Sequence, residues 1–335
     1  MILVTGGTGY IGSHAVIELL EKGYEILIID NLSNSSEKVL KKIENISNKS
    51  VFFEKIDLLD TLALKELFKK YNIQAVMHFA GLKSVEESTK DPLNYYLNNV
   101  VGTINLCKEM SLNNVKKLIF SSSATVYGTS NQVPFSEDTE TSVTNPYGRT
   151  KKIIEEILQD LYASDNEWKI SILRYFNPIG AHPSGKIGES PLGAPNNLMP
   201  IITQVAIGER KLLKIFGNQY NTVDGTGVRD YIHVVDLVKG HIKALDFLEK
   251  KDGFSIFNLG TGKGYSVLEL ANKFEKVTNL KVPYTITAPR LGDIAVCYAD
   301  TSKAKTELNW NAEKDLEDMC IDAWRWQNMN PYGIK

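Results

Sequence analysis

The first 30 residues follow a pattern that few folds allow. An apolar run at residues 2–4 leads into glycines at positions 6, 9 and 12, and a helix is expected over residues 13–22. A second apolar run then ends in Asp30. A strand, a glycine loop, a helix and a strand within about 30 residues are typical of dinucleotide-binding units, because glycine lets the backbone approach a pyrophosphate at a helix N-terminus. The pattern predicts such a site, with a purely structural turn as the alternative.

Asp30 lies 18 residues beyond the last glycine of this loop. Its carboxylate is placed to accept a hydrogen bond from the adenosine ribose 2′-hydroxyl and to repel a 2′-phosphate. No arginine follows at residues 31–35, so the sequence predicts NAD rather than NADP. A role as a helix N-cap is the alternative for Asp30, and it would not exclude ribose binding.

Strands and helices continue to alternate along the chain. Further strands are expected at residues 51–53, 75–81 (with a turn), 117–120, 171–175 and 255–260. Further helices are expected at residues 62–71, 93–113, 147–161 and 234–248. Such repeated units predict an α/β fold built on a doubly wound parallel sheet of the Rossmann type.

The texture of the sequence changes after residue 178. Glycine, proline and asparagine are frequent up to about residue 227, which indicates a smaller C-terminal α+β lobe for the substrate. The helix and the strand expected after residue 230 indicate a return to the first domain. We therefore assign residues 1–178 and 230–262 to an NAD-binding Rossmann domain, and residues 179–229 and 263–335 to the substrate lobe.

Charge and composition argue against several classes of function. The 335 residues carry a net charge of −2 with no basic block, which argues against nucleic acid as a partner. No apolar run approaches the ~20 residues of a membrane span, and the opening strand leaves no room for a signal peptide, so we expect a cytoplasmic protein. The three cysteines and five histidines show no metal-ligand spacing, and His78, inside an apolar strand, is expected to be a hydrogen-bonded core residue.

A short stretch in the middle of the chain, residues 145–151, carries the candidate chemistry. Pro146 suits the first position of a helix, where its missing N–H would have no partner. Tyr147 and Lys151 are four residues apart, so they share a helix face. A nearby ammonium and the helix N-terminus both favour a phenolate, so Tyr147 is a candidate base, with a simple surface pair as the alternative. Ser123, at the carboxyl end of an expected strand, lies where open parallel sheets bind ligands.

Taken together, these motifs resemble those of the extended short-chain dehydrogenase/reductases. The resemblance to the nucleotide-sugar 4-epimerases of that family extends over nearly the whole chain. The stretches that carry it are residues 6–13 (GGTGYIGS), 79–83 (FAGLK), 120–128 (FSSSATVYG), 145–148 (NPYG), 173–183 (LRYFNPIGAHP), 195–200 (PNNLMP) and 224–234 (DGTGVRDYIHV).

The resemblance implies a tightly bound NAD and a UDP-sugar substrate. The implied NAD contacts are Gly6, Gly9, Tyr10, Ile11, Gly12, Asp30, Asn31, Leu32, Ser33, Asn34, Ser35, Asp57, Leu58, Phe79, Ala80, Gly81, Lys83, Asn98, Ser123, Tyr147, Lys151 and Phe176. The implied substrate contacts are Ser123, Tyr147, Asn177, Asn197, Leu198, Phe216, Arg229, Arg290, Asp293 and Cys297. Arg229 and Arg290 suit a pyrophosphate as fixed donors, although either alone would more often be a surface ion-pair partner.

The reaction implied by the resemblance is inversion at C4 of a UDP-hexose, UDP-glucose or UDP-galactose, through a 4-keto intermediate. Tyr147 is expected to take the 4-hydroxyl proton while NAD⁺ takes the C4 hydride. Ser123 is expected to hydrogen-bond the reacting oxygen, and Lys151 to hold the nicotinamide ribose and lower the pKa of Tyr147. A dehydratase or oxidoreductase of the same family is the alternative. Where the dehydratases carry an acid after the serine or threonine, this chain has Ala124 and Thr125, which disfavours elimination of water.

Two further expectations follow from the resemblance. Cys297 stands at a position that borders the C2 substituent of the sugar, and family members with a small residue there tend to admit N-acetylhexosamines as well. The alternative is that Cys297 is simply a small buried residue. Family members are usually homodimers, and the helices expected at residues 93–113 and 150–161 are those that would meet a second copy.

Overall fold

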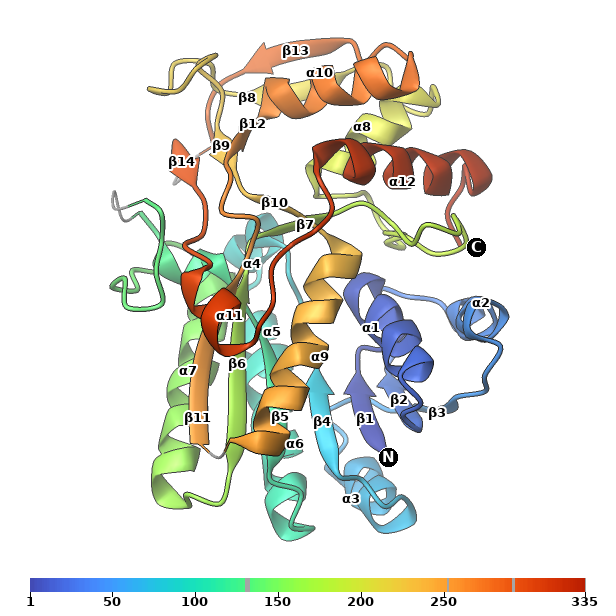
Figure 1. Ribbon diagram of the computed structural model, residues 1–335, viewed down its shortest axis with the longest axis vertical. Coiled ribbons are helices and arrows are strands. Elements are labelled where there is room, and N and C mark those ends of the chain that lie inside the picture. The colour runs from blue at the N-terminus through green and yellow to red at the C-terminus, as the bar shows by residue number, and fades with distance from the viewer. Residues whose placement is uncertain (130–132, 252, 291–292, 335) are drawn as a thin grey trace.

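Seven parallel strands form one sheet through the centre of the protein (Figure 1). The computed structural model describes residues 1–334 except 130–132, 252 and 291–292. The strands lie in the order β11-β6-β5-β4-β1-β2-β3. Their bounds are β1 Ile2–Thr5, β2 Ile26–Asp30, β3 Phe52–Lys55, β4 Ala75–His78, β5 Lys117–Ser123, β6 Lys169–Tyr175 and β11 Gly253–Leu259. The strand order reverses between β1 and β4, and in open α/β sheets ligands bind at the carboxyl ends beside such a reversal.

Helices cover both faces of this sheet (Figure 1). The helices of one face are α1 Tyr10–Glu21, α2 Lys38–Ser47 and α9 Val234–Lys250. The helices of the other face are α3 Thr61–Lys70, α6 Gly102–Leu112 and α7 Pro146–Ser164, with the short α4 Val85–Lys90 and α5 Pro92–Tyr95 beside α7. Because both faces are covered, Val4 packs into one core and Leu3 into the other, and β1 has three successive apolar residues before Thr5 rather than an alternating pattern.

The predicted fold class, a doubly wound parallel sheet with a smaller C-terminal lobe, is confirmed. Several element boundaries differ from the sequence-based expectation, and two of these lie at the candidate site. Helix α1 begins at Tyr10 rather than at residue 13, because Gly9 is its N-cap. Strand β5 continues through Ser123, so the serine run forms the end of the strand instead of following it.

The single helix expected over residues 93–113 is also wrong. A π-helical turn, Tyr96–Val101, separates α5 from α6. In this turn the buried Asn99 side chain accepts a hydrogen bond from the Leu82 N–H at 2.8 Å and donates to the Leu82 carbonyl at 3.0 Å. The π-helical turn thus coincides with a buried side chain that bonds to another segment, and such turns are frequent at functional sites.

The smaller lobe packs around its own core, which includes Ile202, Phe274 and Met319. Its helices are α8 Leu198–Ala206, α10 Val267–Thr278 and α12 Leu316–Met329. Its strands are β7 Asn177–Ile179, β8 Leu213–Phe216, β9 Val228–Arg229, β10 Tyr231–His233, β12 Tyr265–Ser266, β13 Tyr284–Thr287 and β14 Val296–Cys297. These form a three-stranded sheet, β12-β9-β14, and the pairs β10-β7 and β13-β8.

The chain crosses between the sheet and the lobe several times. Helix α9 and strand β11 return to the large sheet after the first part of the lobe, and α11 Ser302–Glu307 also packs against β11 (Figure 1). Each crossing passes the carboxyl ends of the strands, so residues distant in the sequence meet there.

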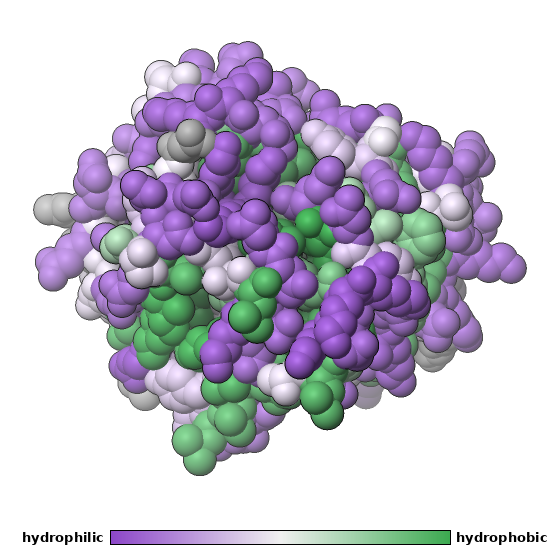
Figure 2. All heavy atoms as spheres, turned by 90° about the horizontal axis from the view of Figure 1, so that it is seen from below, coloured by the Kyte–Doolittle hydropathy of each residue, from purple (hydrophilic) through white to green (hydrophobic). Residues whose placement is uncertain are grey.

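The face opposite the lobe is mostly polar, and apolar side chains reach it in separate patches (Figure 2). Of the helices that the structure describes, none has the length and apolar character needed to span a membrane.

Candidate active site

The glycine loop between β1 and α1 leaves no room for side chains. Gly6 has a positive φ of 68°, and a Cβ there would lie 2.8 Å from the backbone nitrogen of Ala80. A Cβ on Gly12 would lie 2.2 Å from the carbonyl oxygen of Gly6. Glycine at these two positions therefore lets the loop pack closely against the end of β4 and the start of α1, as the turns of dinucleotide-binding folds do.

Asp30 ends β2 and organises the loop that follows it. Its carboxylate accepts hydrogen bonds from the backbone N–H of Thr8 at 3.2 Å, the N–H of Leu32 at 2.9 Å and the hydroxyl of Ser35 at 3.1 Å. The alternative role as a helix N-cap is wrong, because α2 begins only at Lys38. The glycine loop and the predicted ribose-binding segment are thus joined through one carboxylate.

Further predicted NAD contacts come from the segments that follow β2 and β3. Asn31 donates to the carboxylate of Asp57 at 2.9 Å, and Leu58 is buried, with its carbonyl accepting from Asn105 at 3.0 Å. Ser33 and Asn34 are exposed loop residues.

Beyond β4, the predicted cofactor residues line the next loop. The ring of Phe79 packs on His241, with ring centroids 4.8 Å apart. Lys83 is exposed and pairs with Glu189 at 2.7 Å. The side chain of Asn98 donates to Asn99 at 2.9 Å, which ties it to the π-helical turn.

His78 is a core residue, as predicted. It is buried between the hydroxyls of Thr5 at 2.7 Å and Thr103 at 2.8 Å. Burial lowers the pKa of His78 to about 3, so the imidazole is neutral. No group of His, Cys, Asp and Glu among the residues described by the structure could hold a metal ion.

Ser123, Tyr147 and Lys151 meet at the carboxyl end of β5 and the first turns of α7. Pro146 occupies the first turn of that helix, and the Asn145 side chain caps it by accepting from the Gly148 N–H at 2.8 Å. Only 9% of Ser123, 8% of Tyr147 and 6% of Lys151 is exposed, so the alternative of a surface Tyr/Lys pair is wrong.

The pKa of Tyr147 differs from the sequence-based expectation. Burial raises it, and a hydrogen bond with Ser123 acts in the opposite direction. Lys151 does not lower it in the polypeptide alone, because its ammonium donates to the carbonyl of Ser121 at 2.8 Å and lies 4.8 Å from the centre of the Phe120 ring. Ser123 is therefore the group that opposes the effect of burial on the pKa of Tyr147.

The predicted substrate residues fall into two groups on the lobe. Arg229 pairs with Asp293 at 2.5 Å, and Cys297 lies beside Arg229 in the β9–β14 pair. The Arg290 guanidinium lies 3.9 Å from the centre of the Phe216 ring. Together these place two guanidinium groups and an aromatic ring on one side of the lobe.

The remaining predicted contacts lie where β6 leads into the lobe. Phe176 is buried directly after β6, and Asn177 is exposed in β7. Asn197 donates to Glu189 at 2.7 Å, and Leu198 begins α8. None of these positions conflicts with a role in binding, and their roles stay predictions.

Comparisons with known proteins agree with this geometry. Residues 3–323 match a family described as GDP-mannose 4,6 dehydratase. The chain is 56% identical over 334 residues to UDP-glucose 4-epimerase of Bacillus subtilis (strain 168), which covers 100% of this chain and 98% of the relative. The chain belongs to the UDP-glucose 4-epimerase family. The fold of the family is shared in full: the structure of UDP-glucose 4-epimerase from Bifidobacterium longum in complex with NAD⁺ and UDP has a TM-score of 0.97 at 50% identity, over 99% of both chains. The structure of the UDP-Glc/GlcNAc 4-epimerase from Campylobacter jejuni has a TM-score of 0.85 at 37% identity, over 98% of this chain and 99% of that one.

Two residues of this family member lie at the site although the sequence did not single them out. Tyr175 ends β6 opposite Ser123 in the parallel register, hydrogen-bonds Ser121, and has a pKa raised by burial and by Tyr147 nearby. Glu189 contacts both Lys83 and Asn197. The position of Tyr175 at a strand end was a usable signal, whereas nothing in the glycine-rich surroundings of Glu189 marked it.

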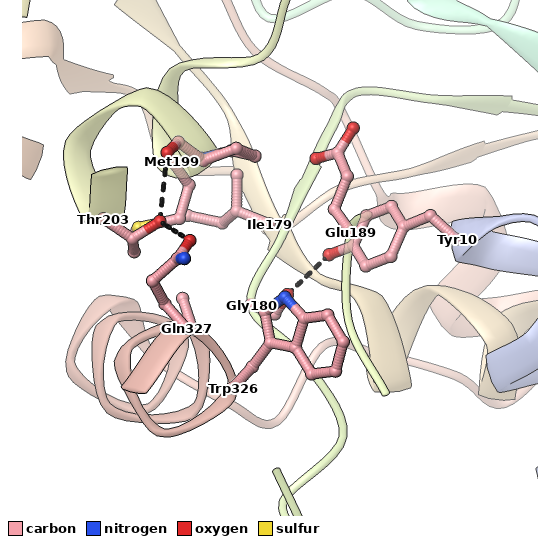
Figure 3. A pocket seen from close by; sticks show the side chains of 10 residues that line it. Tyr10, Ile179, Gly180, Glu189, Met199, Thr203, Trp326 and Gln327 are labelled. Carbon is pink, nitrogen blue, oxygen red and sulfur yellow. Dashed lines mark hydrogen bonds between the residues drawn. The ribbon is translucent and has the colours of Figure 1, made fainter. Parts of the chain in front are cut away.

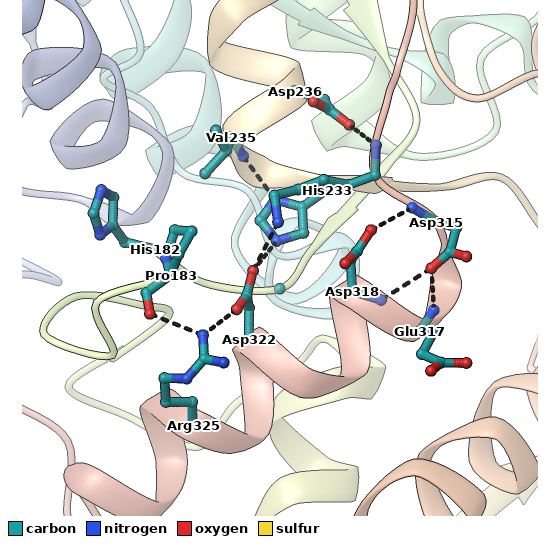
Figure 4. Close-up of polar contacts among 12 residues, drawn as sticks. His182, Pro183, His233, Val235, Asp236, Asp315, Glu317, Asp318, Asp322 and Arg325 are labelled. Carbon is teal, nitrogen blue, oxygen red and sulfur yellow. Dashed lines mark hydrogen bonds and ion pairs between the residues drawn. The ribbon is translucent and has the colours of Figure 1, made fainter.

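One contact fixes the epimerase lobe against the sheet domain, and a second joins two elements within the lobe. The Tyr10 hydroxyl, from the start of α1, donates to the carbonyl of Gly180 at 2.7 Å beside Glu189 and Trp326 (Figure 3). His233 donates to Asp322 of α12 at 3.2 Å, and Asp322 also accepts from Arg325 (Figure 4). The lobe is thus held at the glycine loop itself.

Proposed function

We propose that the protein is an NAD-dependent epimerase that inverts C4 of UDP-hexoses, interconverting UDP-glucose and UDP-galactose. The observation that carries the proposal is the buried meeting of Ser123, Tyr147 and Lys151 beside the bare glycine loop, in a chain of the UDP-glucose 4-epimerase family. Relatives crystallised with NAD support the same cofactor here.

The cofactor would be held by the glycine loop, Asp30 and Lys151, and when bound it supplies the hydride acceptor that C4 oxidation needs. Tyr147 acts as the base that takes the 4-hydroxyl proton, and it returns a proton when the alcohol is re-formed. Ser123, already hydrogen-bonded to the phenol, positions the reacting oxygen. Burial of all three side chains keeps water from the 4-keto sugar.

The lobe holds the nucleotide part of the substrate. Arg229 and Arg290 bind the pyrophosphate, because planar guanidinium groups give paired hydrogen bonds to phosphate oxygens. Phe216 offers an aromatic face under Arg290. The 4-keto sugar must rotate so that its opposite face receives the hydride. Firm binding is therefore expected at the UDP part of the substrate, away from the reacting carbon.

A dehydratase is not favoured, although one bears the name of the matching family. Elimination of water needs an acid beside the serine, and the hydroxyl of Thr125 instead donates to Ser123 at 3.0 Å. Ala124 has no titratable group. An oxidoreductase would release its cofactor in every turnover.

The decisive experiment is to assay purified protein with UDP-glucose and UDP-GlcNAc side by side and to measure the co-purifying nucleotide. Epimerisation without net NADH, together with bound NAD, is the expected result. Net NADH formation would favour the oxidoreductase, and a 4-keto-6-deoxy product would favour the dehydratase.

The finer substrate range depends on Cys297. Its side chain is buried with Phe176 and Ala299, and burial raises the thiol pKa to about 12, so it is a small uncharged group. We infer that this small group leaves room for a C2 acetamido substituent. The Campylobacter relative is named as a UDP-Glc/GlcNAc 4-epimerase, so both kinds of sugar occur among the proteins that this chain resembles.

A second copy of the chain is the proposed protein partner. Leu93, Leu97 and Val101 are four residues apart, and 74%, 53% and 37% of these side chains are exposed, which leaves an apolar stripe on this helical segment. We place the protein in the cytoplasm because its three cysteines, Cys107, Cys297 and Cys320, are buried and unpaired.

The alkaline side of the pH profile should report Lys151. Burial lowers the Lys151 pKa to about 8, and the charge of Glu155 acts in the opposite direction. We expect kcat to fall as pH rises through about 8, because the neutral amine no longer holds the ribose or supports a phenolate at Tyr147. Steady-state rates from pH 6 to 10 measure this.

The pH dependence of folding stability has the opposite sign, so a loss of activity at high pH can be distinguished from unfolding. Because the folded-state pKa of Lys151 lies below the unfolded value, proton release favours the folded state as pH rises through this range. The variant Lys152→Met, at the partly buried neighbouring lysine, should keep the same profile as the wild type. A constant kcat up to pH 10 would contradict the assignment.

A further inference from the structure

A chain of buried polar side chains begins on the catalytic helix, one turn beyond Lys151. Glu155 accepts from the Ser122 hydroxyl at 2.5 Å and pairs with Arg174 of β6 at 2.6 Å. Glu155 and Arg174 are each about 5–6% exposed. The pair ties α7 to the two strands that end in Ser123 and Tyr175.

Tyr127 carries the chain onward from Arg174. The Arg174 guanidinium donates to the Tyr127 hydroxyl at 3.3 Å, and that hydroxyl donates to the Asn258 side-chain oxygen at 2.6 Å. The Tyr127 ring stacks on Phe135, with centroids 5.0 Å apart, and on Phe176 at 6.5 Å. Tyr127 and Asn258 are both fully buried.

Asn258 connects this chain to the segment that bears Cys297. Its side-chain amide donates to the Phe135 carbonyl at 2.8 Å. The Phe135 backbone also accepts from the Asp300 N–H at 2.7 Å and donates to the Tyr298 carbonyl at 2.9 Å. The segment of Cys297 is therefore attached, through a continuous series of hydrogen bonds, to the helix that carries Tyr147.

We propose that Tyr127 and Asn258 are specificity-positioning residues, which set the width of the sugar pocket by fixing the Cys297 segment relative to Ser123 and Tyr147. This rests on the proposed function, in which Cys297 borders the C2 substituent. Neither residue contacts the reacting atoms. A buried polar network can satisfy all of its hydrogen bonds in only a few arrangements. Removing one hydroxyl therefore loosens the Cys297 segment, while the hydrophobic cluster around it stays assembled.

Tyr127→Phe tests the proposal, since it removes the hydroxyl and keeps the ring. Arg174 retains Glu155 and the Glu137 carbonyl at 3.2 Å, so no charge is left unpaired. UDP-GlcNAc and UDP are each measured as competitive inhibitors of UDP-glucose turnover. We expect the inhibition constant of UDP-GlcNAc to fall at least about threefold, because the Cys297 segment can move away from the acetamido group. The inhibition constant of UDP should stay unchanged.

Asn258→Asp provides a second variant, because it keeps the acceptor for Tyr127 and loses the amide donor to Phe135. The inhibition constant of UDP-GlcNAc should fall in this variant as well. Tyr71→Phe is the matched control: its hydroxyl bonds Glu54 at 2.8 Å at the opposite end of the sheet, and both constants should match the wild type.

Two outcomes overturn the inference: constants for UDP-GlcNAc and UDP that change in parallel, or constants for both that do not change in Tyr127→Phe. Failure of the proposed function has a different signature, because the wild type itself would then not epimerise UDP-glucose.

Discussion

Replacing Tyr147 with phenylalanine is expected to lower turnover of UDP-glucose by about 10²–10⁴-fold, the contribution typical of a positioned general base. The ring still fits its buried site on α7, but no group remains to take the 4-hydroxyl proton. Ser123 does not replace it, because an unassisted hydroxyl is a poor base. NAD should remain bound, because the glycine loop and the Asp30 segment do not depend on the phenol.

Two measurements separate this outcome from misfolding. Nucleotide released from the denatured Tyr147→Phe protein should equal that of the wild type, and the thermal unfolding midpoint should change little. Tyr162→Phe is the matched control on the same helix, where the ring stacks on Phe254 at 6.1 Å, away from the site, and its turnover should be normal. Near-normal turnover of Tyr147→Phe would refute the assignment of the base.

The core of the fold was predictable because burial dictates it locally. A strand covered on both faces is mostly apolar, as β1 is at Ile2, Leu3 and Val4, and the helices between strands are amphipathic. The π-helical turn was not predictable, because the feature that accompanies it, the bonding of Asn99 to the backbone of Leu82, is a contact between separate elements.

The candidate site was likewise predictable only in part. Ser123, Tyr147 and Lys151 follow from a strand end and a helix start, which the sequence marks. The direction of the Lys151 ammonium depends instead on the carbonyl of Ser121, which only the packed structure brings near. Glu155 lies four residues beyond Lys151 on the same helix face, so that spacing was a signal, but its buried partner Arg174 comes from β6.

Replacing Cys297 with tyrosine should abolish turnover of UDP-GlcNAc while UDP-glucose turnover continues. Cys297 lies buried against Phe176 and Ala299, so a phenol at this position has no free volume within the core and must extend toward the sugar pocket. The C2 acetamido group is the one substituent that distinguishes the two substrates, so it alone should lose its space. kcat/KM for both substrates measures the selectivity.

The added volume of tyrosine is also expected to destabilise the folded protein, so stability is measured as a control. Overpacking a core typically destabilises a protein by about 1–3 kcal/mol, so the unfolding midpoint of Cys297→Tyr is measured together with its rates. Cys297→Ala keeps a small side chain and should turn over both substrates. Because we propose that Arg229 and Arg290 hold UDP, the affinity for free UDP should be the same in all three proteins. Equal losses on the two substrates would mean that Cys297 is only a packing residue and that the pocket is bounded elsewhere.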